Sequence, residues 1–87
     1  MKSIEIQEKV YDLLKAKNFT APYGILLSEQ LSKNGKKYKS VTFGYARTHD
    51  YELQIYNKNF MILRDSAAFG NLVFNSYEEL EKHLSTL

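Results

Sequence analysis

The chain has 87 residues, 44% of them hydrophobic, and a net charge of +2, which suits one small folded domain spanning 1–87 and excludes a disordered chain. It contains no cysteine, so disulfides, thiolate zinc sites and cysteine nucleophiles are excluded.

The N-terminal segment is predicted to be a helix over residues 4–17. Apolar residues recur at helical spacing from Ile6 to Leu14, and Ser3 is placed to cap the first turn. Pro22 prevents continuation of the helix. Glu5 lies inside the first ten residues, which is not typical of a signal peptide, and we expect a cytoplasmic protein.

The next segment contains the clearest turn signal in the chain. Asn34-Gly35 lies between two strand-like runs, 23–33 and 36–47. Asn-Gly favours a two-residue type I′ hairpin turn, because both central residues of that turn need a positive φ. The sequence therefore predicts an antiparallel hairpin.

The two-residue turn predicts a register in which paired residue numbers sum to 69, so that Leu31 faces Tyr38 and Leu26 faces Phe43. Apolar groups then occur on both faces. One face holds Tyr23, Ile25, Leu27, Leu31 and Tyr38, and the other holds Leu26, Val41, Phe43 and Tyr45. A sheet with one face in water alternates more cleanly. We therefore expect the second face to be covered in part by the chain itself or by a partner.

The middle of the chain is predicted to continue the sheet. Residues 47–50 read as a connection, 51–56 as a third strand with alternating apolar residues, 57–59 as a turn, 60–64 as a fourth strand and 72–74 as a short fifth strand.

The C-terminal segment carries a strong helix signal. Ser76 with Glu79 three residues later forms a capping box, and Tyr77, Leu80 and Leu84 form an apolar stripe. The predicted fold class is α+β, with an N-terminal helix, a four- to five-stranded antiparallel meander sheet and a C-terminal helix, both helices on one face.

The sequence carries little sign of catalytic chemistry, and we expect a non-enzymatic protein without metal or cofactor. It has two histidines without metal-ligand spacing and no glycine-rich phosphate loop. Arg47, His49, Asp50 and Tyr51 do gather a cation, a base, a carboxylate and a phenol. That cluster keeps a small metal-independent ribonuclease toxin as an alternative.

Positive charge is concentrated in residues 15–39, where six lysines face a single acidic residue, Glu29. Such a segment attracts an acidic partner. A nucleic-acid-binding protein that uses the lysine-rich hairpin is therefore a second alternative.

The leading hypothesis is a small interaction module that binds a protein partner, or itself as a dimer, through a tyrosine-rich sheet face. The tyrosine content favours a recognition surface. The enrichment in Lys, Asn and Ile is typical of AT-rich coding sequences and favours a bacterial, phage or mobile-element source. The candidate partner-binding residues are Tyr38, Tyr45, Arg47, Tyr51 and Tyr56, with Lys36, Lys37 and Lys39 steering an acidic partner.

Overall fold

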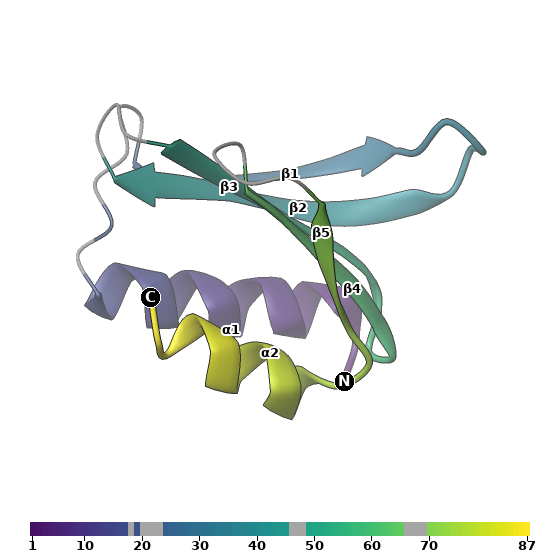
Figure 1. Ribbon diagram of the computed structural model, residues 1–87. Coiled ribbons are helices and arrows are strands. Elements are labelled where there is room, and N and C mark those ends of the chain that lie inside the picture. The colour runs from purple at the N-terminus through teal and green to yellow at the C-terminus, as the bar shows by residue number, and fades with distance from the viewer. Residues whose placement is uncertain (18, 20–23, 46–48, 66–69) are drawn as a thin grey trace.

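The structure is a computed structural model that describes residues 1–17, 19, 24–45, 49–65 and 70–87, with the backbone alone described at 45, 49 and 50. Its elements are α1 (Ser3–Ala16), β1 (Leu26–Leu31), β2 (Lys37–Tyr45), β3 (His49–Asn57), β4 (Phe60–Asp65), β5 (Asn71–Phe74) and α2 (Tyr77–Leu84). The five strands form one antiparallel meander in the order β1-β2-β3-β4-β5. Both helices lie on the same face of this sheet (Figure 1). The predicted fold class is confirmed.

Helix α1 begins one residue earlier than the sequence suggested. Lys2 is the N-cap residue, and its backbone N–H donates to the Glu5 carboxylate at 3.0 Å. The predicted capping role of Ser3 is wrong, because its hydroxyl instead donates to the backbone oxygen of Tyr56 at 3.2 Å. Ser3 therefore fastens the start of α1 to the end of β3.

The hairpin between β1 and β2 differs from the prediction by one residue. Its turn has three residues, not two: the Gly35 N–H donates to the Ser32 oxygen at 2.9 Å, and the Ser32 N–H donates to the Lys36 oxygen at 2.8 Å. Gly35 has a φ of +79°, the left-handed position that closes this longer turn. The Ser32 hydroxyl also accepts from the Lys36 N–H at 3.1 Å and so favours the longer loop.

The longer turn changes the register, so that paired residue numbers sum to 68. Leu26 lies opposite Thr42, Leu27 opposite Val41 and Leu31 opposite Lys37. The predicted pairings of Leu31 with Tyr38 and of Leu26 with Phe43 are therefore wrong. A shift of one residue moves every β1 side chain to the other face, so Leu27, not Leu26, shares the helix side with Val41.

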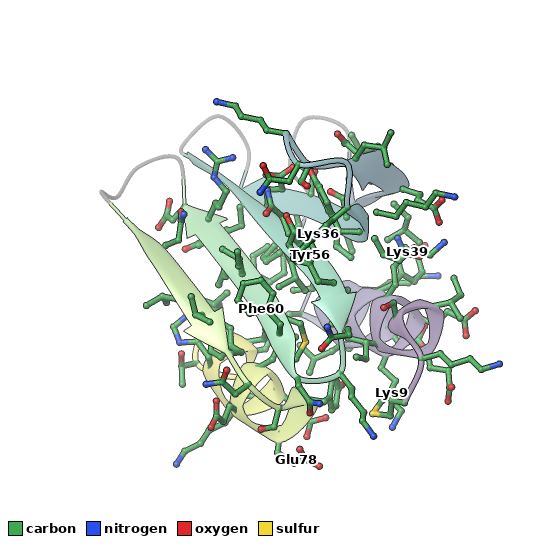
Figure 2. The ribbon with its side chains drawn as sticks, turned by 90° about the vertical axis from the view of Figure 1, so that its right-hand side faces the viewer. Lys9, Lys36, Lys39, Tyr56, Phe60 and Glu78 are labelled. Carbon is green, nitrogen blue, oxygen red and sulfur yellow. The ribbon has the colours of Figure 1, made fainter. Side chains whose placement is uncertain are left out.

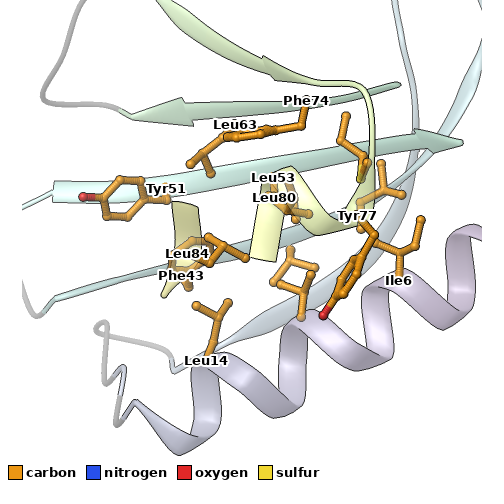
Figure 3. Packing of buried hydrophobic residues seen from close by; sticks show 14 of the residues in the cluster. Ile6, Leu14, Phe43, Tyr51, Leu53, Leu63, Phe74, Tyr77, Leu80 and Leu84 are labelled. Atoms are coloured by element: carbon orange, nitrogen blue, oxygen red, sulfur yellow. The ribbon is translucent and has the colours of Figure 1, made fainter. Parts of the chain in front are cut away.

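The hydrophobic core lies between the sheet and the two helices (Figure 3). Its fully buried members include Ile6, Val10 and Leu14 of α1, Val41 and Phe43 of β2, Leu53 and Ile55 of β3, Met61 of β4, and Leu80 and Leu84 of α2. Phe43 stacks on Tyr51 with ring centroids 5.1 Å apart and meets the edge of Phe19 at the same distance. These contacts close the core beyond the end of α1.

Gln7 is a buried polar side chain that joins α1 to the β1–β2 hairpin. Its amide nitrogen donates to the backbone oxygens of Ser28 and Ser40, both at 3.1 Å. These two residues face each other across the hairpin. Beyond this point, the far end of the hairpin extends past the helix layer (Figure 1).

Tyr77 opens α2 and packs into the core, with the Lys9 ammonium group 5.3 Å from its ring centroid. Burial, followed by a hydrogen bond with Glu81, raises the pKa of Tyr77 to about 12. None of the described helices is long and apolar enough to span a lipid bilayer.

Replacing Gln7 tests the link between α1 and the hairpin. Gln7→Ala removes two hydrogen bonds and leaves a cavity, so we expect the free energy of unfolding to fall by about 2–3 kcal/mol. Urea unfolding followed by circular dichroism measures this change. The exposed neighbour Glu8 is the control, and Glu8→Ala should change stability by less than about 0.5 kcal/mol. Equal effects of the two substitutions would contradict the role of Gln7.

The raised pKa of Tyr77 predicts a loss of stability in alkali. The unfolded chain loses the phenolic proton near pH 10, whereas the folded chain keeps it up to about pH 12. Stability from this group is therefore complete below pH 10 and falls as the pH rises toward 12. Tyr77→Phe should flatten the part of the pH profile between 10 and 12, as measured by urea unfolding at several pH values. An unchanged profile would contradict this assignment.

Candidate interaction surface

The face of the sheet opposite the helices carries a continuous apolar patch. Because side chains alternate along a strand, the residues next to the core positions point to this helix-free face. The patch, called the open-face patch below, consists of Tyr38 on β2, Tyr56 on β3, Phe60 and Ile62 on β4, and Val73 on β5.

Three aromatic rings form one end of the patch. The centroids of Tyr38 and Tyr56 are 5.0 Å apart, and those of Tyr56 and Phe60 are 5.4 Å apart. Tyr38 is 8% exposed, Tyr56 is half-buried and Phe60 is 39% exposed, so exposure increases along the row. Figure 2 shows Tyr56 and Phe60 next to each other near the centre of this view of the sheet. The buried ring of Tyr38 supports the two rings that solvent can reach.

Aliphatic side chains continue the patch toward the edge strand β5. Ile62 lies on the same side of β4 as Phe60, and Val73 lies opposite Ile62 on β5. Val73 is 52% exposed. The patch therefore crosses four neighbouring strands, which distinguishes it from isolated exposed apolar residues that need no explanation.

A polar network borders the patch and holds its rings in place. The Tyr56 hydroxyl donates to Gln54 Oε1 at 3.3 Å, and Gln54 Nε2 donates to Glu52 Oε1 at 3.0 Å. Glu52 also pairs with Arg64 at 3.6 Å. Burial, together with the nearby Glu52 charge, raises the pKa of the Tyr38 phenol. Tyr56 is thus oriented by a chain of side chains that runs along β3 and crosses to β4 at Arg64.

Exposed lysines lie at the same end of the sheet as the aromatic row. Lys33 belongs to the hairpin turn, and Lys36 follows the turn and immediately precedes β2, two residues before Tyr38. Positive charge therefore borders the aromatic end of the patch.

Lys37 and Lys39 fall on the helix side of β2, because they alternate with Tyr38. Lys39 pairs with Glu29 on β1. This hydrogen bond, with the attraction between the two charges, lowers the pKa of Glu29. Lys39 is thus a partly neutralised charge, whereas Lys36 lies at the border of the patch.

The structure brings some of the predicted binding residues together and separates others. Tyr38 and Tyr56 lie in the open-face patch with Lys36 beside them. Tyr51 belongs to the core on the helix side, where it stacks on Phe43. Arg47 and the side chain of Tyr45 lie outside the described residues. Participation of these residues in binding stays a prediction.

Three members of the patch were absent from the predicted set: Phe60, Ile62 and Val73. The four apolar residues at 60–63 of the predicted fourth strand indicate that both sides of this strand are apolar. That signal identifies Phe60 and Ile62 as candidates once Met61 and Leu63 are known to face the core. Val73 gives no such signal, because its strand has only four residues.

A hollow lies on the helix side of the sheet. It has a volume of about 360 Å³ and is lined by apolar residues together with Tyr51, Asp65, Asn71 and His83. His83 also contacts the Phe74 ring, with centroids 5.5 Å apart. Across the described ranges, no three His, Cys, Asp or Glu residues are placed to hold a metal ion.

Ser40 on the open face allows a test of how tightly this surface is packed. Its side chain is fully buried, and its hydroxyl has no hydrogen-bond partner among the described residues. Ser40→Ala should therefore raise the free energy of unfolding by about 0.5–1 kcal/mol. Ser28 is the matched control, because it faces Ser40 but is exposed and accepts from Gln30 Nε2 at 3.3 Å. A marked loss of stability in Ser40→Ala, measured by urea unfolding, would show that the hydroxyl is satisfied.

Comparison of the chain with protein-family models, with curated proteins and with solved structures gives no match. The function of this surface is therefore argued from its own residues.

Proposed function

We propose that this chain is a non-enzymatic interaction module that binds an acidic protein through the open-face patch. The observation that carries the proposal is the continuous run of Tyr56, Phe60, Ile62 and Val73 on the face of the sheet without helices. Buried aromatic and aliphatic anchors surrounded by polar groups are the usual anatomy of a protein interface.

The arrangement of the patch supports a fixed rather than an adaptable binding surface. The Tyr56 ring lies between two other rings, and its hydroxyl is held by Gln54. A side chain ordered in the free protein loses little conformational entropy on binding. Tyr56 and Phe60 therefore fit the role of central anchors.

Charge supports the choice of an acidic partner. Lys33 lies in the hairpin turn and Lys36 lies between the turn and Tyr38, and both are exposed. Cations at the rim of an interface accelerate association with an acidic surface, and added salt screens this attraction. We expect these lysines to affect the association rate more than the final affinity.

Nucleic-acid binding and ribonuclease activity are the two alternative functions. Nucleic acid fits the neighbourhood of the lysine turn and the exposed rings, since bases stack on aromatic side chains. Ile62 and Val73 favour a protein partner, because aliphatic groups offer no stacking platform. The ribonuclease hypothesis stays a prediction, because Arg47 and the His49 side chain lie outside the described residues.

The proposal is tested by capture on immobilised chain from an extract of its source organism, with and without nuclease. Phe60→Ser should reduce the recovered partner through a loss of about 2 kcal/mol, roughly 30-fold in affinity. Val73→Ser should reduce it as well. Binding is then measured with the purified partner by calorimetry.

Leu72→Ser is the matched control for Val73→Ser. The two residues are neighbours on β5 with exposures of 49% and 52%, but they point to opposite faces. Loss of binding in Leu72→Ser with none in Val73→Ser would reject the open-face patch. Capture that disappears with nuclease would favour the nucleic-acid alternative.

A further inference from the structure

Strand β1 is an outer strand of the sheet whose second edge is unpaired within the described residues. It pairs with β2 on one side only, and all six of its residues are exposed. Proteins usually protect such an edge with charged side chains, proline or a bulge. β1 has no proline, lysine or bulge, and Glu29 is its single charged residue.

The backbone groups on the outer edge follow from the hairpin register. In an antiparallel pair, every second residue directs its N–H and C=O away from the partner strand. The Ser32 N–H donates to the Lys36 oxygen, so the even-numbered residues of β1 direct their backbone N–H and C=O groups toward β2. Leu27, Glu29 and Leu31 therefore present unpaired donors and acceptors to the outside.

The side chains of the same three residues share the helix side of the sheet. Leu27 is 44% exposed and Leu31 is 64% exposed. They lie two residues before and two residues after Glu29, so the pattern Leu-x-Glu-x-Leu is unchanged when the strand direction is reversed. A strand with this symmetry is complementary to a second copy of itself.

We propose that two copies of this chain associate through β1, antiparallel about a twofold axis at Glu29, to form a continuous ten-stranded sheet. In this register Leu27 of each copy lies opposite Leu31 of the other, and all three outward residues exchange backbone hydrogen bonds. A register centred on Ser28 instead places Leu27 opposite Glu29 of the second copy. The two leucine pairs therefore favour the register centred on Glu29 over the one centred on Ser28.

Charge sets the strength of this association. The two Glu29 carboxylates meet at the axis, where like charges repel. Each is neutralised in part by Lys39 of its own copy. Since six residues per copy bury less than the roughly 1,200 Å² of a standard interface, the dimer is weak and depends on concentration.

Sedimentation equilibrium between about 10 µM and about 1 mM tests the proposal with the whole chain. The mass should rise from 10.1 kDa toward twice that value. Leu31→Lys should weaken association at least about tenfold. Glu29→Pro should abolish it, since this N–H points outward and its loss spares the ladder with β2. Glu29→Gln should strengthen it by removing the repulsion.

Leu72→Lys on the opposite edge strand is the control and should leave association unchanged. Circular dichroism establishes that each variant is folded. A strictly monomeric chain at the highest concentration would overturn the proposal. The partner of β1 would then be an extended segment of another protein. A dimer that persists in both Leu31→Lys and Glu29→Pro would overturn it as well.

Discussion

The size of the helix layer constrains the whole molecule. Two helices about 10 Å in diameter cover about 20 Å, which matches the roughly 19 Å between the outer strands of a five-stranded sheet. They can therefore cover at most one face, and even there residues of the outer strands, such as Leu27 and Leu72, stay partly exposed. Every apolar residue on the remaining face has to be shielded from water by its neighbours in the sheet or by another molecule. Packing within the row from Tyr38 to Phe60 shields Tyr38 but leaves Phe60 partly exposed.

Most of the fold follows from local patterns in the sequence. Ser76 caps α2 as expected, its hydroxyl accepting from the Glu79 N–H at 3.2 Å, whereas the Glu79 carboxylate accepts from the Asn75 N–H at 3.2 Å in place of the Ser76 N–H of the predicted capping box. The meander order follows because its strands are joined by short turns, as between β3 and β4. The hairpin register did not follow, because Asn-Gly suits both a two-residue and a three-residue turn. Ser32 makes the difference through a hydrogen bond that the dipeptide alone does not reveal.

The candidate surface was predictable only in part for a related reason. Tyrosines suit both a core and a binding surface, so their number does not assign them to a face. On β3 the alternation with Leu53 and Ile55 does assign them: Tyr51 stacks in the core and Tyr56 lies on the other face. On β2 the pattern is ambiguous, because the side opposite Tyr38 holds both the charged Lys39 and the core residue Val41. The face of Tyr38 is therefore a property of the assembled sheet.

Strand β1 is held less firmly than its partner strand. Strand β2 pairs with β3 as well as with β1, and Tyr38 packs on Tyr56. Strand β1 pairs with β2 alone, and Gln7 joins it to α1 at Ser28. Past Ser28, β1 lacks a helix beneath it (Figure 1) and its residues are exposed, so separating this end from β2 exposes little apolar area. Local opening of such a segment costs less than global unfolding. The end of β1 can therefore fray while β2 and the core stay folded.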